Sequence, residues 1–193
     1  MLFSLQGIPC LYYGTEQGLQ GTVRADGAPD LGSLESVRQA LWGKPAAFDK
    51  GHPLHGHIGR LASLRRREPP LSFGRLYFRE VSGNGIDFGQ SSGPGGVVAF
   101  SRILADREVV ATANTSSTEP FSGFVLVDRD LSAGPRRMSV EFSNIGTRGA
   151  GEVRLVENAP FHRPGGEVAV GTAAVLPIVL APHEAQILVL APV

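Results

Sequence analysis

The runs VVAFSRI at residues 97–103 and EVVATA at residues 108–113 decide the fold class of most of this chain. Both runs are short and rich in β-branched residues, and a connection that contains Asp106 separates them, which is typical of antiparallel strands. Seven more such runs are separated by Gly, Pro, Asn or Asp: residues 76–81, 123–127, 138–142, 152–156, 167–170, 174–180 and 185–190. Nine short strands predict an antiparallel β-sandwich of the Greek-key type.

The composition is that of a globular, turn-rich protein. The chain has 193 residues, of which 42% are hydrophobic, and its 25 glycines and 14 prolines follow no period. Eighteen basic residues balance eighteen acidic ones, so the charge predicts neither a nucleic acid nor an anionic membrane as a partner. No apolar run approaches the roughly 20 residues that cross a bilayer.

The first residues, MLFSLQGIPC, do not have the pattern of a secretion signal. They lack a basic start, Gln6 and Gly7 interrupt the apolar run, and Ile8-Pro9 does not supply the small residues of a cleavage site. We therefore expect no targeting signal on this chain, with the cytoplasm as the default location. Cys10 is the single cysteine, which excludes an internal disulfide, and its apolar neighbours predict a buried, unreactive side chain.

The first third of the chain has a different pattern. Residues 2–6 are typical of a last helical turn ended by Gly7, and residues 8–13 of a strand buried on both faces. A glycine-rich loop is expected over residues 14–32 and a short helix over residues 33–42. A clearer helix begins at Pro53, repeats an aliphatic residue every three or four positions, and ends at Pro69-Pro70.

A lone strand of this kind cannot bury both of its faces with two helices alone. We therefore predict that residues 1–73 are the end of a larger α/β domain and that residues 74–193 form the sandwich. Because residues 1–70 would then expose apolar faces, we expect a shortened chain that starts near Gly74 to be the better-behaved protein.

Several segments resemble, in order, the alpha-amylase family of glycoside hydrolases (family 13). GIPCLYYGTEQG at residues 7–18 is similar to the eighth strand of the family's (β/α)8 barrel and its loop, and VRQALWG at residues 37–43 to a later loop segment. Residues 58–71 resemble the final barrel helix, and FSRI at 100–103 and ANT at 113–115 resemble strands of the C-terminal β domain. The resemblance thus implies a strand-loop-helix remnant of the barrel followed by the sandwich.

The resemblance also implies what the chain lacks. In this family the nucleophile, the acid/base and a third carboxylate come from barrel strands four, five and seven, all before Met1, and no Asn-His-Asp sequence occurs here. We therefore assign no catalytic residue, metal or cofactor. We expect the C-terminal fragment of a glycosidase that acts on alpha-glucans or related alpha-glucosides, inactive alone, with the missing barrel part as its partner. The sequence does not determine which glycosidic linkage is cleaved, or whether the reaction is hydrolysis or transglycosylation.

Three residues are candidates for substrate binding. By the resemblance, Tyr13 and Glu16 occupy the loop at the C-terminal end of strand eight, where barrel active sites form. Trp42, the only tryptophan, could stack on the C–H face of a sugar ring. The alternative is structural: Tyr12 and Tyr13 pack, Glu16 anchors the loop by hydrogen bonds, and Trp42 is a buried helix-end residue.

Other patterns carry less weight. Residues 89–93 match G-x-S-x-G but lead into a strand rather than a helix, the three histidines at 52, 55 and 57 lack a zinc spacing, and the arginines at 65–67 suit a helix end. Asn114-Thr115-Ser116 is a glycosylation sequon by pattern only. A stand-alone carbohydrate-binding or structural β module is the alternative function, although Tyr77 is the only tyrosine in the sandwich region.

Overall fold

The computed structural model describes residues 1–19, 26, 41–43, 47–90, 96–132, 136–163 and 165–190. The chain divides into two compact units, one formed by Met1–Ile8 with Leu64–Val193 and the other by Pro9–Ser63. The larger unit contains all the strands of the described residues. The predicted boundary between residues 73 and 74 stays a prediction, and the two units are described separately below.

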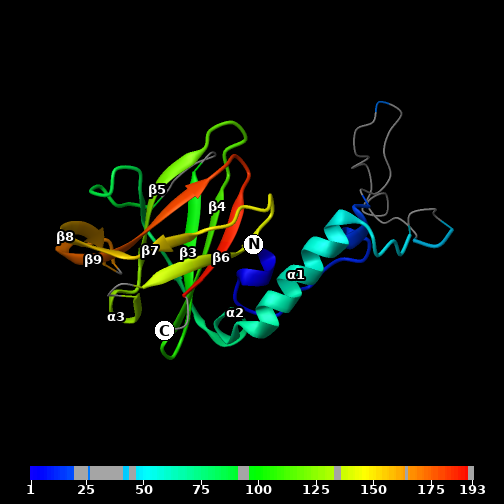
Figure 1. The fold of residues 1–193 in the computed structure, drawn as a ribbon, viewed down its shortest axis with the longest axis horizontal. Coiled ribbons are helices and arrows are strands. Elements are labelled where there is room, and N and C mark those ends of the chain that lie inside the picture. The colour runs from blue at the N-terminus through cyan, green and yellow to red at the C-terminus, as the bar shows by residue number, and fades with distance from the viewer. Residues whose placement is uncertain are drawn as a thin grey trace. The chain divides into compact units, whose positions relative to one another are not determined.

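The larger unit is built on two antiparallel sheets (Figure 1). The six-stranded sheet has the order β1 (Arg75–Phe78), β3 (Val97–Leu104), β4 (Arg107–Asn114), β10 (Ala185–Leu190), β6 (Arg137–Ser143) and β7 (Ala150–Glu152). The four-stranded sheet has the order β2 (Val81–Ser82), β5 (Phe121–Val127), β9 (Val168–Leu180) and β8 (Arg154–His162). The predicted antiparallel β-sandwich is confirmed.

The core of the sandwich follows the alternation of its strands. In β3 and β4, Ala99 and Val110 belong to the main buried cluster, while their neighbours in sequence face the other side of the sheet. β5 and β9 supply the opposing layer. The buried members of this cluster are Val97, Ala99, Val110, Val125, Val127, Met138, Val153, Ala174, Leu176, Ile178, Leu180, Leu188 and Leu190.

Four of the predicted strands are divided or joined differently in the structure. The run at residues 76–81 divides at Arg79 and Glu80: the Arg79 amide donates to Ala99 O of one sheet, and Glu80 O accepts from Leu126 N of the other. The run at 152–156 divides between β7 and β8, and the runs at 167–170 and 174–180 form the single strand β9. Sequence alternation does not distinguish one long strand from two strands that join different sheets.

Helical segments precede the first strand and follow β5, and most of α1 (Pro53–Arg67) belongs to the smaller unit. The predicted last helical turn is a three-residue 3-10 helix, η1 (Leu2–Ser4), and Gly7 adopts the left-handed φ of +99°. α2 (Pro69–Phe73) follows the end of α1, and α3 (Arg129–Ser132) follows β5. The predicted helix from Pro53 to Pro69-Pro70 is therefore confirmed.

The strand predicted at residues 8–13 is wrong, because the structure has no strand there and Ile8 is 95% exposed. A strand buried on both faces needs neighbouring strands and covering helices, and the residues that the structure describes provide no neighbouring strand for this segment. The expectation of a buried Cys10 fails for the same reason, since its side chain is exposed. Most of the loop at 14–32 and of the helix at 33–42 lies outside the described residues. In the described part, no helix is long and apolar enough to cross a membrane.

Candidate functional site

The loop that contains two of the predicted site residues is held by a buried glutamine. Gly14 and Gly18 have left-handed backbones and bracket η2 (Thr15–Gln17). The side chain of Gln17 accepts a hydrogen bond from Asp49 N at 2.9 Å and donates one to Asp49 O at 3.3 Å. Only glycine suits position 14, because a Cβ there would also lie 2.7 Å from Leu19 Cδ1. The loop therefore has a fixed local geometry.

This geometry places Tyr13 and Glu16 in one turn of chain. Tyr13 is 45% exposed and its ring lies 4.5 Å from that of Tyr12, whereas Glu16 is half-buried within η2. Trp42 is 87% exposed, and within the described part of the chain no hydrogen bond or ring contact joins it to Tyr13 or Glu16. A buried helix-end role for Trp42 is therefore excluded, while substrate binding by the three residues stays a prediction.

The histidines before and within α1 have local roles. His52 Nδ1 accepts a hydrogen bond from Leu54 N at 3.3 Å, and His57 Nδ1 lies 3.1 Å from Arg60 Nη2. Among the residues that the structure describes, no group of three or more His, Cys, Asp or Glu is placed to hold a metal ion.

A hollow in the sandwich unit was not anticipated from the sequence. It has a volume of about 630 Å³, and it is lined by residues 77–80 where the chain leaves β1, by Gln90, and by the turn between β8 and β9. His162 is the last residue of β8, Arg163 follows it, and the two glycines of the turn, Gly165 and Gly166, have left-handed backbones. Two sheets thus contribute to one concave surface, which includes the sandwich tyrosine, Tyr77.

The polar centre of this hollow is a carboxylate and an imidazole. Glu80 is 7% exposed and its carboxylate accepts from both His162 N at 3.1 Å and His162 Nδ1 at 2.8 Å. The two residues are 82 positions apart in the sequence, so no local pattern joins them. An ionised carboxylate can only accept hydrogen bonds, so this pairing places a proton on Nδ1.

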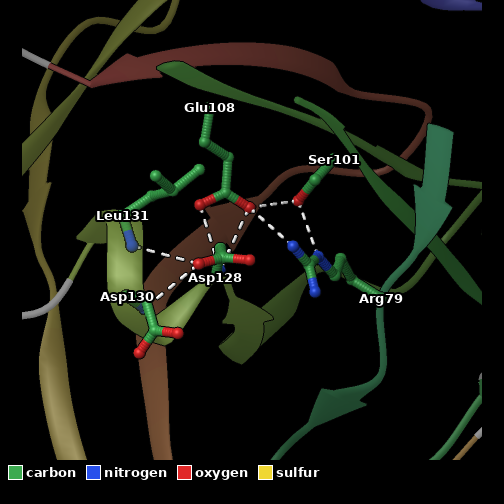
Figure 2. Close-up of polar contacts among 6 residues, drawn as sticks. All are labelled: Arg79, Ser101, Glu108, Asp128, Asp130 and Leu131. Carbon is green, nitrogen blue, oxygen red and sulfur yellow. Dashed lines mark hydrogen bonds and ion pairs between the residues drawn. The ribbon is translucent and has the colours of Figure 1, made fainter. Parts of the chain in front are cut away.

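Beside the hollow, a second carboxylate is fully buried. Figure 2 shows Glu108 surrounded by donors: Ser101 Oγ at 2.5 Å, Arg79 Nη2 at 3.0 Å, and Asp128 N at 3.0 and 3.1 Å from its two oxygens. The carboxylate of Asp128 in turn accepts from the amides of Asp130 and Leu131 at the start of α3. Glu108 therefore holds the Arg79 guanidinium by a hydrogen bond and is itself inaccessible to a ligand.

Two buried arginines hold the first residues of the chain within the larger unit. Arg102 is 0% exposed and donates to Ser4 O at 2.8 Å and to Gly74 O at 2.7 and 3.2 Å. Arg65 donates to the carbonyl oxygens of Phe3, Leu5 and Gly7 at 2.6, 3.1 and 2.5 Å. Burial lowers the pKa of both guanidinium groups, and Arg65 lowers that of Arg102 further. These hydrogen bonds hold residues 1–7 against the rest of this unit, and of these residues Phe3 and Ser4 are buried.

The sequon asparagine is a structural residue. Asn114 is 4% exposed, and its Nδ2 donates to Glu119 O at 2.8 Å and to Ala181 O at 3.2 Å. Its Oδ1 accepts from Ser116 N at 3.0 Å. The side chain therefore joins three stretches of backbone at one end of the sandwich.

Comparison with known proteins adds a family context. No protein-family model matches the chain. It is 29% identical over 135 residues to an alpha-amylase from Streptomyces lividans, covering 64% of this chain and 14% of that protein. It is 30% identical over 112 residues to a cyclomaltodextrin glucanotransferase from Bacillus licheniformis, covering 58% of this chain and 14% of that protein. The chain resembles the C-terminal part of alpha-amylase-family glycoside hydrolases.

Solved structures of alpha-amylase-family enzymes share the fold. CldA, a cyclomaltodextrin glucanotransferase with a three-domain ABC distribution, aligns with a TM-score of 0.59 at 18% identity, over 100% of this chain and 31% of that one. An Anoxybacillus alpha-amylase aligns with a TM-score of 0.55 at 20% identity, over 100% of this chain and 31% of that one. The chain therefore spans about 14% of the relatives matched in sequence and about a third of these structures.

Proposed function

We propose that this chain is the C-terminal part of an alpha-amylase-family glycosidase that acts on alpha-glucans or related alpha-glucosides, and that it hydrolyses nothing by itself. The observation that carries this proposal is the match to an alpha-amylase and to cyclomaltodextrin glucanotransferases, which covers about 60% of this chain but 14% of the relatives. The alternative is a stand-alone carbohydrate-binding or structural module, and the hollow beside Tyr77 favours a binding role.

The chemistry of glycoside hydrolysis supports inactivity of the chain alone. A retaining glycosidase needs two accessible carboxyl groups about 5–5.5 Å apart, one as nucleophile and one as acid/base. The buried glutamates of the sandwich do not supply such a pair. Glu80, Glu108 and Glu184 are each nearly or fully buried, and each accepts hydrogen bonds from its own fold.

In a longer enzyme, the loop that holds Tyr13 and Glu16 would contribute to the substrate cleft. Its fixed geometry suits this role, because Gln17 and Asp49 hold the loop while Tyr13 stays half-exposed. Trp42, which is exposed, would add a stacking surface for a sugar ring.

The first test uses the chain as it is. We expect no release of reducing sugar from soluble starch or maltoheptaose, and hydrolysis by the purified chain would overturn the proposal. The second test is to determine the coding sequence before the Met1 codon in all three frames. A barrel with Asn-His-Asp and the missing carboxylates is expected there, and its absence would favour the stand-alone module.

The third test uses the longer enzyme, where Tyr13→Ala and Glu16→Gln should lower kcat/KM by roughly ten- to a hundredfold, because each would contact the sugar near the reacting centre. The matched control is Lys50→Ala, an exposed residue of the same unit, which should leave kcat/KM unchanged. Equal activity of all three variants would remove Tyr13 and Glu16 from the substrate cleft.

A further inference from the structure

The hollow beside β1 has the size and lining of a ligand site. Its volume of about 630 Å³ lies within the range of small-molecule pockets, roughly 300–1,000 Å³. One wall comes from the end of β1 and the residues that cross to the other sheet, and the opposite wall comes from the turn between β8 and β9. Both walls belong to the same compact unit.

The charged groups of the hollow are compensated by partners of opposite sign. Arg79 Nη2 lies 3.0 Å from Glu108 Oε1, and His162 Nδ1 lies 2.8 Å from Glu80 Oε1. At the rim, Arg163 Nη1 lies 3.9 Å from Glu167 Oε2. Both arginines of the lining already lie near a carboxylate, so the lining suits an uncharged ligand better than a phosphate or a carboxylate.

The imidazole of His162 supplies the polar contact. Its Nδ1 is hydrogen-bonded to Glu80, which holds the ring in place, and 47% of the side chain is exposed. Nε2 accepts a hydrogen bond when the ring is neutral and donates one when it is protonated. A hydroxyl group can satisfy either state, because it both donates and accepts.

The Tyr77 ring supplies the apolar contact. The Arg79 guanidinium lies 5.7 Å from the centroid of this ring, and the Tyr77 side chain remains partly exposed. Phe78 is the next residue of β1, so its ring lies on the other face of the strand, against Phe100 at 6.4 Å between centroids. An exposed ring that is already held in position packs on an apolar face at little cost in conformational freedom.

We propose that this hollow binds an uncharged polyhydroxylated ligand, an alpha-glucan segment, with a C–H face against Tyr77 and a hydroxyl group on His162 Nε2. The choice of an alpha-glucan rests on the proposed function. The polyhydroxylated character rests on the compensated arginines, the oriented imidazole and the partly exposed Tyr77 ring. The site is separate from the loop of Tyr13 and Glu16, which belongs to the other compact unit.

The test is a titration of the ¹⁵N-labelled chain, followed by backbone amide chemical shifts. The probes are maltoheptaose, cellohexaose and inorganic phosphate. We expect maltoheptaose to shift the amides of Tyr77, His162 and Gly165 with a millimolar Kd. Tyr77→Ala and His162→Gln should each weaken binding about threefold to tenfold. Both side chains are partly exposed, and an unchanged amide spectrum elsewhere would establish that each variant is folded.

The matched controls are Phe73→Ala, an exposed aromatic outside the hollow, and His55→Gln, a histidine of the other unit. Both should bind maltoheptaose as the unchanged chain does. Absence of shifts with maltoheptaose, shifts confined to other surfaces, or phosphate binding in its place would each overturn the inference. Equal binding of cellohexaose would overturn the alpha-glucan choice. None of these outcomes affects the proposed function, which the hydrolysis assays test.

Discussion

The guanidinium group of Arg102 donates a hydrogen bond to the carbonyl oxygen of Ser4, 98 residues earlier in the chain, at 2.8 Å. Arg102 lies in β3, so this bond joins the first helical turn directly to the six-stranded sheet. The guanidinium group of Arg102 is fully buried, and its hydrogen-bond partners are carbonyl oxygens rather than a carboxylate. The stability of the sandwich and the position of residues 1–7 are therefore coupled.

Replacement of Arg102 should show the strength of this coupling. Arg102→Met leaves the carbonyls of Ser4 and Gly74 without their donor, so we expect the free energy of unfolding to fall by about 2–4 kcal/mol. Urea denaturation measures the change. Arg75→Met, at an exposed position of β1, is the control and should change stability by less than about 0.5 kcal/mol. Equal effects of the two substitutions would contradict a structural role for Arg102.

A chain that starts at Gly74 should be less stable than the full chain. It would lose Ser4 O, a partner of Arg102, and buried Leu71, which is 1% exposed. This expectation is the reverse of the one drawn from the sequence, where residues 1–70 are only a source of exposed apolar surface. Urea midpoints of the two chains at equal concentration decide between them, and a higher midpoint for the shorter chain would favour the sequence-based expectation.

The stability of the sandwich should depend on pH through Glu184. Burial raises the pKa of this carboxyl group, but hydrogen bonds from Thr147, Ala181 N, Gln186 and Ser143 outweigh it and lower the pKa from its ordinary value of 4.5. Because the pKa of Glu184 is lowered in the folded state, its contribution to the free energy of unfolding is complete above pH 4.5. This contribution is lost as the pH falls through the pKa of the folded state.

The measurement is the free energy of unfolding at pH 7 and at about pH 3.5. Glu184→Gln should lower stability at pH 7 and flatten its decrease toward acid. The control Glu157→Gln, at an exposed position of β8, should keep the pH dependence of the unchanged chain. An unaltered slope in Glu184→Gln would mean that other carboxylates cause the acid sensitivity.

Thr112 offers a stabilising substitution. Its side chain is 0% exposed, and in the described part of the chain its Oγ1 has no hydrogen-bond partner. A buried hydroxyl without a partner is unfavourable, so Thr112→Val should raise the free energy of unfolding by about 1 kcal/mol. Thr115→Val is a useful contrast, since Thr115 Oγ1 donates to Gly96 O at 2.7 Å and its removal should not stabilise the chain.

Cys10 should react quickly with a thiol reagent in the folded chain. Its side chain is exposed, and no other cysteine competes for the reagent. We expect labelling by dithiobisnitrobenzoate to reach one equivalent without denaturant, at a rate close to that in urea. Labelling that required urea would show that residues 8–13 are buried in solution, through association of copies or by another route.

The sequence predicted those features that depend on local patterns. β3, β4 and β10 carry long apolar runs with turns at their ends, and α1 has Pro53 at its start and Pro69 beyond its end. Residues 8–13 show the limit of this reasoning. Their composition suits a strand that is covered on both faces, but a strand forms only if neighbouring strands accept its hydrogen bonds. No strand pairs with residues 8–13 in the part of the chain that the structure describes.

The hollow was missed for a related reason. Tyr77 and His162 lie far apart in the sequence, and they approach because the chain passes from one sheet to the other at Arg79 and Glu80. The available signal in the run LYFREV was the pair of successive charged residues at positions 79 and 80, because they break the alternation of a single strand where the chain crosses. Arg102 within VVAFSRI and Glu108 at the start of EVVATA are also charged, and both are buried and hydrogen-bonded, but neither lines the hollow.

The buried amide of Asn114 also bears on how this protein can be produced. An oligosaccharyltransferase acts on the side-chain nitrogen of a sequon, and in the folded sandwich that nitrogen is shared between two backbone carbonyls. A glycan could be attached only before the chain folds, because Asn114 is buried in the folded sandwich. A yeast or insect secretion host would thus convert part of the product into chains that cannot complete the fold, whereas a bacterial host has no such loss.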